Sequence, residues 1–513
     1  MRRAATGGWT LLAIAVAVAG AACALVGRGQ ESTPKRRNDA EKQVARPTPL
    51  YYGVAACAEC HNGPPKNNLL CPCTELPIWR DKDKHQLAFL VLKNERGQRM
   101  AKNLDMDVTK PKAGCIRCHG VETGDTPRHE SFSIEEGVSC VVCHGAFKEW
   151  VNYHGLLLER QEWRAHSPKT KKEQFGMTDL WDPATRTNLC VSCHVGNAEE
   201  GKFVTHAMYA AGHPPLPGIE VATFSEQMPH HWQYLRDKSP EILKSLRFDR
   251  AAVQFERLRL VAISSLATLR ESMTLLAAQA DRCASAKEAD DKVLDLANFD
   301  CYACHHDLRS SSGWRQRRYV GTPGRPQMRT WSVPLAKITL EVMKGDEAVK
   351  SLDAGLKNVY AAFSMQPFGS CPEIATAARA LASQLEQWIA ELAKPETHYD
   401  QTTAARYLRQ LCSIGEQATP DYDGARQIAW AFETIYEEWK PNSTDKDPRV
   451  TEVIGALKRD LKLELPKRAA GAESTGESAI EKDLPNSLSK IYEYDPETLK
   501  KGLRKLSELL PAK

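Results

Sequence analysis

The pentapeptide Cys-x-x-Cys-His occurs five times in this chain of 513 residues. It is the attachment signature of c-type haem. Two thiols three positions apart reach the two vinyl groups of one haem, and the adjacent histidine then binds the iron as proximal ligand. With 16 cysteines and 15 histidines in the chain, chance would supply only about 0.01–0.02 such pentapeptides. The sequence therefore predicts five covalently attached haems c.

Each motif supplies two attachment cysteines and one proximal histidine. The attachment cysteines are Cys57, Cys60, Cys115, Cys118, Cys140, Cys143, Cys190, Cys193, Cys301 and Cys304. The proximal iron ligands are His61, His119, His144, His194 and His305. A structural zinc site needs four ligands grouped in a pair of short motifs, and a thioredoxin-like dithiol needs no histidine directly after it. Haem attachment is therefore favoured over both.

Residues 1–28 are predicted to be a signal peptide or an N-terminal membrane anchor. Arg2 and Arg3 precede an uncharged apolar stretch of about 19 residues, which is just long enough to span a bilayer. Small residues flank Cys23 and offer a cleavage site, while Cys23 itself is a candidate for lipid attachment. A cleaved signal, an uncleaved anchor and a lipoprotein signal all remain open. Each predicts an exported protein, periplasmic or anchored to a membrane and facing the periplasm.

The composition changes along the rest of the chain. Residues 29–49 are polar, contain prolines near their end, and are predicted to be a linker. Residues 50–240 hold four of the five motifs, are rich in Gly, Pro and His, and lack long periodic runs. We expect them to form a four-haem cytochrome domain of short helices and loops wrapped around haems.

Residues 241–332 are expected to form a long helix followed by the fifth motif and a basic loop. Apolar residues recur at three- and four-residue steps from Phe255 to Leu276, which indicates an amphipathic helix. Six arginines follow the fifth motif: Arg309, Arg315, Arg317, Arg318, Arg325 and Arg329. They are interpreted as a solvated basic loop, as clamps for haem propionates, or as a docking patch for an acidic partner.

Residues 333–465 are predicted to be a helical bundle. Ser370 and Glu373 form a plausible capping box ahead of a stripe of apolar residues that runs from Ile374 to Leu392. A disulfide between Cys371 and Cys412 is one candidate for pinning this bundle. Residues 466–513 are predicted to be a linker and a short helical tail. Because no strand pattern of any length is present, the fold class is predicted to be mainly α.

Each haem iron has a second axial position, and ten histidines outside the motifs are candidates for it. They are His85, His129, His154, His166, His206, His213, His230, His231, His306 and His398. Eight of them fall between residues 85 and 231, amid the haem motifs. The best candidates for distal ligands are His85, His154, His206 and His213, with His129, His166, His230 and His231 in reserve. The spacing of His206 and His213 puts both on one side of a two-turn helix.

Two elements resemble the cytochrome c-554/c-552 family of multihaem cytochromes. One is Gly137–Gly145, which contains the third motif and is followed by His154. The other is the first motif followed by Trp79 and His85, which is similar to the family's Trp–Ser–His element. The chain departs from the family at Asp81–Lys84, where a small hydroxyl residue is usual.

The resemblance covers about residues 50–215 of a larger pentahaem cytochrome. It implies an all-α haem scaffold and a role in electron transfer. It also implies that His85 and His154 reach haems other than those nearest in sequence. In that family one of four haems lacks a distal protein ligand.

We therefore expect an exported pentahaem cytochrome that relays electrons through closely packed, mostly bis-His haems to redox partner proteins. The alternative is a multihaem oxidoreductase that reduces or oxidises a small nitrogen or sulfur species at one open haem iron. An electron carrier is favoured over an enzyme, and no catalytic residue is assigned. The formal net charge of +4 names no partner, and no lysine-rich tract indicates nucleic-acid binding.

Overall fold

The computed structural model describes residues 48–63, 73–155, 163, 165–246, 248, 253–288, 292–305, 324–415, 421–440, 445–465 and 494–511. The predicted signal or anchor, nearly all of the first linker and residues 466–493 of the second lie outside these ranges. The structure is 65% helical, and its described part has isolated bridges in place of strands. The predicted mainly α fold is therefore confirmed. The chain from Arg46 onward forms one compact unit, and the boundaries predicted within it stay predictions.

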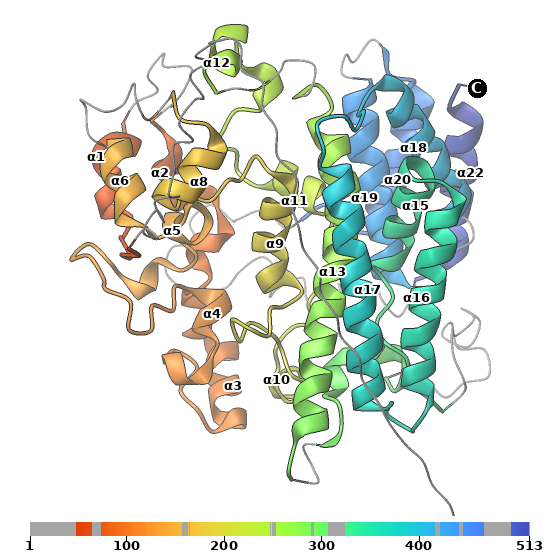
Figure 1. Cartoon of the computed structure of the whole chain (residues 1–513), viewed down its shortest axis with the longest axis horizontal. Coiled ribbons are helices and arrows are strands. Elements are labelled where there is room, and N and C mark those ends of the chain that lie inside the picture. The colour runs from red at the N-terminus through yellow and green to blue at the C-terminus, as the bar shows by residue number, and fades with distance from the viewer. Residues whose placement is uncertain are drawn as a thin grey trace, which may run out of the picture. The chain divides into compact units, whose positions relative to one another are not determined.

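The segment with the first four motifs consists of short helices joined by loops (Figure 1). Ser167 caps one of them through the Thr170 amide, and Gly176 ends that helix with a φ of +77°, which favours glycine. The helices are α1 (Ala55–His61), α2 (Glu75–Lys82), η1 (Lys84–Leu87), η2 (Leu90–Leu92), α3 (Glu95–Leu104), η3 (Pro111–Ala113), α4 (Ile116–His119), η4 (Ile134–Glu136), α5 (Cys140–His144), α6 (Lys148–Gly155), α8 (Pro168–Phe175), α9 (Pro183–His194), α10 (His206–Ala211), α11 (Val221–Gln227), η5 (Leu235–Asp237) and α12 (Pro240–Ser245).

Side chains alone give this segment little apolar core. Up to the third motif its buried hydrophobic residues form small separate clusters, one around Val121 and Val141 and another around Phe89 and Ile116. Burial of apolar area is the main term that stabilises a folded chain. These small clusters therefore contribute little stability, as is expected of a segment whose core is formed mainly by cofactors.

The predicted amphipathic helix is present as α13 (Glu256–Ser285). Its first turn is capped from another helix, because the Glu438 carboxylate accepts hydrogen bonds from the amides of Arg257 and Leu258 at 3.1 and 2.8 Å, where helix amides lack intrahelical partners. Among the described helices α13 is the one long and apolar enough to cross a membrane, but 72% of its apolar window is buried in the protein. It is thus placed as the central core helix. Two short turns follow it, η8 (Leu296–Asn298) and η9 (Cys301–Ala303).

The predicted bundle is present and packs on α13. Its helices are α15 (Val333–Met343), α16 (Asp346–Ser364), α17 (Cys371–Leu392), α18 (Gln401–Gly415), α19 (Tyr422–Trp439), α20 (Pro448–Asp460) and the tail helix α22 (Pro496–Leu509). Figure 1 shows α16, α17 and α13 side by side. The stripe from Ile374 to Leu392 is buried as predicted, and one large hydrophobic cluster joins α13 to the bundle.

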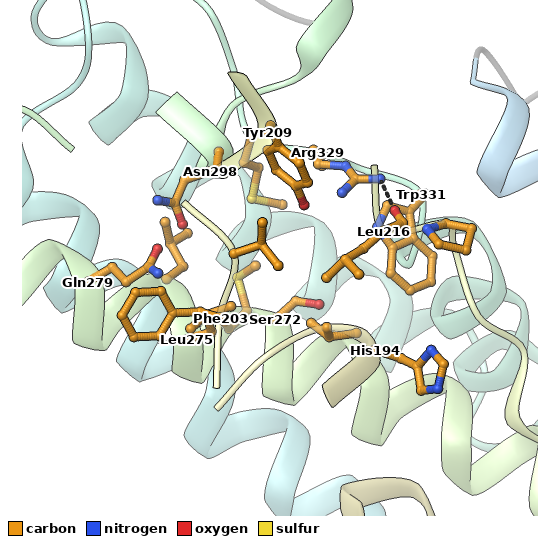
Figure 2. Close-up of a pocket in the computed structure, with 17 residues that line it drawn as sticks. His194, Phe203, Tyr209, Leu216, Ser272, Leu275, Gln279, Asn298, Arg329 and Trp331 are labelled. Carbon is orange, nitrogen blue, oxygen red and sulfur yellow. Dashed lines mark hydrogen bonds between the residues drawn. The ribbon is translucent and has the colours of Figure 1, made fainter. Parts of the chain in front are cut away.

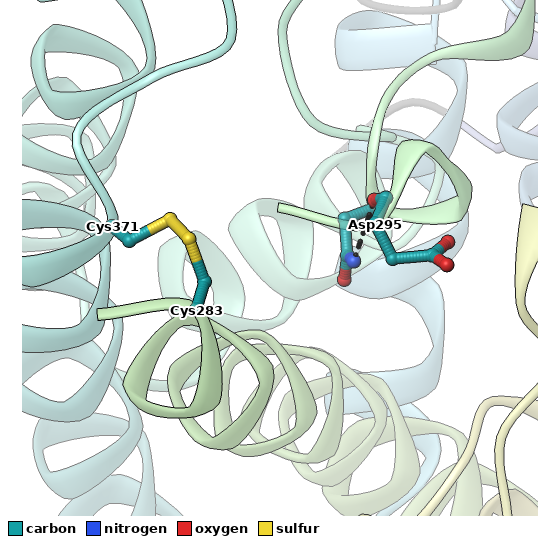
Figure 3. The surroundings of a disulfide bond; sticks show 4 residues. Cys283, Asp295 and Cys371 are labelled. Atoms are coloured by element: carbon teal, nitrogen blue, oxygen red, sulfur yellow. Dashed lines mark hydrogen bonds between the residues drawn. A yellow bond between two sulfur atoms is a disulfide. The ribbon is translucent and has the colours of Figure 1, made fainter. Parts of the chain in front are cut away.

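The start of α17 differs in detail from the prediction. Ser370 is the N-cap residue, but its side chain makes no capping hydrogen bond. Instead Cys371, the first residue of the helix, forms a disulfide with Cys283 at the end of α13 (Figure 3). The predicted pairing of Cys371 with Cys412 is therefore wrong. Cys412 lies inside the bundle with no exposed surface, whereas the ends of α13 and α17 meet with Cα atoms 6.0 Å apart, a separation that a disulfide requires.

Candidate haem-binding site

All five motifs lie in helical turns. The first three occupy α1, α4 and α5, the fourth ends α9, and the fifth begins at the short turn η9. A helical turn places residues three apart on the same face. The two cysteines of each motif therefore point to one side of the turn, and the histidine follows directly after them. This is the local geometry that attachment of one haem needs.

Each motif histidine faces a second histidine from elsewhere in the chain. The distances between ring centres are 5.9 Å for His61–His154, 6.4 Å for His85–His194, 6.3 Å for His119–His213, 6.4 Å for His144–His231 and 6.3 Å for His206–His305. An imidazole nitrogen binds a first-row metal ion at about 2.0–2.1 Å, so two imidazoles on opposite sides of one iron have ring centres about 6 Å apart. The five pairs fit a haem iron between each two rings.

At four of these histidines the Nδ1 nitrogen contacts an acceptor of the protein. The Nδ1 atoms of His61 and His85 lie 2.9 Å from the carboxylates of Glu75 and Asp83. Those of His119 and His213 donate to backbone carbonyl oxygens at 2.8 and 2.7 Å. When Nδ1 donates, Nε2 keeps its lone pair and can bind a metal. These contacts therefore favour the ring form that can bind a metal ion.

Burial keeps several of these rings neutral. It lowers the pKa of His144, His194 and His213 to about 4, and it also lowers the pKa of His119 and His231. The neutral ring is the form that binds a metal ion. At pH 7 the five therefore present lone pairs without first losing a proton.

The element from Trp79 to His85 is built around Asp83. The Trp79 indole nitrogen donates to the carbonyl oxygen of Val138 at 3.1 Å, which ties α2 to the loop before the third motif. Asp83 caps η1, because its side chain accepts from the backbone amide of His85 at 3.0 Å. Burial opposes its ionisation, but the hydrogen bonds and charge of His85 hold the pKa of Asp83 below its usual range. Asp83 thus orients His85, in the segment where the family usually has a small hydroxyl residue.

Cysteines of different motifs also meet. The thiols of Cys57 and Cys140 are close enough to shift each other's pKa, and so are those of Cys118 and Cys193. These contacts bring the first motif beside the third and the second beside the fourth. Groups attached at these sulfur atoms would be close neighbours.

The surroundings of the fifth motif lie against the bundle. Arg329 donates to the carbonyl oxygen of Leu216 at 3.1 Å and to Asp423 at 3.2 Å, and its charge acts on Cys301. Figure 2 shows Arg329 and Tyr209 converging near Leu216, at one side of a cavity of about 90 Å³ that His194 also lines. Arg329 is therefore a partly buried, paired residue. Arg309, Arg315, Arg317 and Arg318 and the candidate His306 lie outside the described residues.

The predicted distal histidines all belong to facing pairs. His154 faces the first motif, His213 the second, His85 the fourth and His206 the fifth. The residue underrated by the sequence is His231, a reserve candidate, which faces His144.

The other candidates sit elsewhere. His129 stacks on Tyr52, His166 packs against Phe175, and His230 packs against Trp232. His398 lines a groove of the bundle that Arg406 also borders. None of these contacts pairs a candidate with a motif histidine.

Comparison with known proteins addresses the first part of this site. Residues 56–145, which include the first three motifs and His85, match the family described as cytochrome c554 and c-prime. No curated protein and no solved structure matches the chain. The match confirms the resemblance over residues 56–145 and supports covalently bound haem c and a haem-based role in electron transfer. Residues 56–145 are thus similar to the family described as cytochrome c554 and c-prime.

Proposed function

We propose that the chain is an exported pentahaem cytochrome c that relays electrons through five bis-His haems. The observation that carries the proposal is the set of five histidine pairs, with ring centres 5.9–6.4 Å apart. The proposed proximal ligands are the five motif histidines. The proposed distal ligands are His154, His213, His231, His85 and His206, in the order of the motifs that they face.

The protein's part in this function is to hold and tune the cofactors. Haem iron supplies reversible one-electron chemistry when bound. The carboxylates of Glu75 and Asp83 and the carbonyl oxygens at His119 and His213 fix ring orientation and ligand basicity. The contacts Cys57–Cys140 and Cys118–Cys193 support close packing of the attached groups, which rapid electron relay requires.

The pairing argues for a carrier over the alternative oxidoreductase. A small nitrogen or sulfur species can react at a haem iron only if one axial position is open. In the proposed ligand set every motif histidine has a partner across the gap. The chain then offers no iron with a vacant protein-ligand position, and the proposed activity is relay to and from redox partner proteins in the periplasm or at its membrane.

The test is a redox titration followed by mixing with possible substrates. All five haems of the holoprotein should be reduced reversibly and in steps. Reduced protein mixed with nitrite, hydroxylamine, sulfite or tetrathionate should reoxidise slowly or not at all. Rapid multiple turnover with any of these four would overturn the proposal in favour of the oxidoreductase.

A further inference from the structure

Asp83 touches the proposed distal ligand of the fourth motif directly. Its side chain is 5% exposed, and its Oδ1 lies 2.9 Å from Nδ1 of His85 and 3.0 Å from the His85 amide nitrogen. An ionised carboxylate accepts hydrogen bonds and donates none. Nδ1 of His85 therefore carries the proton, and Nε2 keeps the lone pair that can bind a metal ion.

The second motif has neutral partners at both of its histidines. His119 donates to the carbonyl oxygen of Ala88 at 2.8 Å, and His213 donates to that of Pro214 at 2.7 Å. A backbone carbonyl is a dipole, whereas Asp83 brings a full negative charge. The hydrogen-bond acceptors thus differ: a buried carboxylate at His85, and carbonyl oxygens at His119 and His213.

The second and fourth motifs are also neighbours. The thiols of Cys118 and Cys193 are close enough to shift each other's pKa. Groups attached to these two cysteines are close enough to exchange an electron. The difference between their reduction potentials then decides which of the two holds it.

We propose that Asp83 is a positioning residue that sets the potential of the fourth-motif haem below that of its second-motif neighbour. The inference rests on the proposed function, because it takes His85 and His194 as axial ligands. A carboxylate bonded to a ligand imidazole raises the basicity of that ligand and favours the oxidised iron. Within this pair an electron is then more stable at the second motif. Transfer from the second motif to the fourth is the energetically unfavourable direction.

The charge of Asp83 acts on more than one motif, so its effects on the third and fourth motifs must be compared. Lys84 lies next to it in sequence, and the charge of Asp83 also acts on His231 and Cys143, which belong to the surroundings of the third motif. The third motif feels this charge through space, without the hydrogen bond that His85 makes. The shift caused by Asp83 is therefore largest at the fourth motif.

The test compares two charge-removing substitutions in the full holoprotein. Asp83→Asn keeps an oxygen that can accept from His85 and removes the buried charge. Asp81→Asn removes a nearby carboxylate that is 51% exposed and paired with Arg80. Asp83→Ser, which keeps a capping acceptor, serves if Asp83→Asn fails to load five haems. The readout is the set of five midpoint potentials from optical titration, with EPR of each variant.

At a fixed potential, Asp83→Asn should raise the ratio of reduced to oxidised fourth-motif haem by about tenfold, which is about 59 mV for a one-electron couple. Asp81→Asn should leave all five potentials in place. His85→Ala identifies the haem concerned, as the one that becomes high spin. The inference is overturned if the Asp83 variant shifts nothing, or shifts most the haem identified by His231→Ala. If His85→Ala leaves all irons low spin, the ligand assignment of the proposed function itself has failed.

Discussion

His231 faces His144 with ring centres 6.4 Å apart and ring planes at 73°. His144 ends α5, whereas His231 lies in the loop that follows α11. Trp232 packs edge-on against the His231 ring at 5.1 Å between centres. The contact with Trp232 thus supports the position of His231 opposite His144, which the proposed role as an axial ligand of the third motif requires.

Replacing His231 tests this relationship. His231→Ala should leave five haems attached, convert one iron from low to high spin, and raise its potential, because one axial imidazole is lost. His230→Ala is the matched control, since His230 packs on Trp232 and Tyr234 and faces no motif histidine. The EPR spectrum of the control should retain five low-spin irons. High-spin iron in the His230 variant alone would reverse the assignment.

The angles between ring planes predict two kinds of low-spin signal. The planes meet at 14° in His61–His154 and at 29° in His206–His305, but at 73–89° in the other three pairs. Nearly parallel imidazoles give rhombic low-spin spectra, and nearly perpendicular ones give strongly anisotropic spectra. His154→Ala should therefore remove a rhombic signal, and His231→Ala an anisotropic one. The opposite losses would contradict the ring orientations.

The disulfide between Cys283 and Cys371 should stabilise the protein measurably. Replacing both cysteines with serine should lower the free energy of unfolding by roughly 2–4 kcal/mol, because the bond restricts a long loop in the unfolded chain. Thermal unfolding with and without reductant checks this. Reductant should lower the midpoint of the wild-type protein to that of the variant and leave the variant unchanged. An equal fall in both proteins would mean that the reductant acts elsewhere.

Asp421 should make stability depend on pH. Burial raises the pKa of this carboxyl from its ordinary 3.8 to about 7, with Asp423 and Asp300 adding to the effect and Gly424 and Arg329 opposing it. Because the folded state holds a proton that the unfolded state loses, wild-type stability should fall as pH rises from about 4 to about 7. Asp421→Asn, which keeps an oxygen for the Gly424 amide, should be more stable than wild type at pH 8 by up to roughly 3–4 kcal/mol. At pH 4 the two should unfold together.

Asp447 provides a control, because its pKa is shifted in the opposite direction to that of Asp421. It caps α20, and its hydrogen bonds and ion pair with Arg449 lower its pKa. Asp447→Asn should therefore be slightly less stable than wild type at pH 8. A gain in stability at pH 8 for both variants would show a general charge effect instead of the burial of Asp421.

The sequence contained much of the fold and most of the site. The spacing from Phe255 to Leu276 predicted α13, and the stripe from Ile374 predicted α17, because buried faces leave a period in the sequence. The motifs were visible because haem attachment fixes residue types at fixed spacing. The ends of α13 and α17 meet only in the folded chain, so the sequence suggested Cys412 as the partner of Cys371 and missed Cys283.

Pairing across space was the main part that could not be read from the sequence. His85 and His154 had a family motif to mark them, while His231 had none and is adjacent to a second histidine of equal rank. Which of the two turns inward depends on the loop after α11 and on Trp232. Asp83 was visible as a departure from the family, but its role needed the 2.9 Å contact with His85.

The most direct test of the account is low-temperature EPR of the oxidised holoprotein, on a sample whose mass shows five haems. If each iron lies between two imidazoles, the spectrum should integrate to five low-spin irons per chain with no high-spin signal. A high-spin signal of one iron per chain would contradict the five histidine pairs and reopen the case for a reactive, open haem.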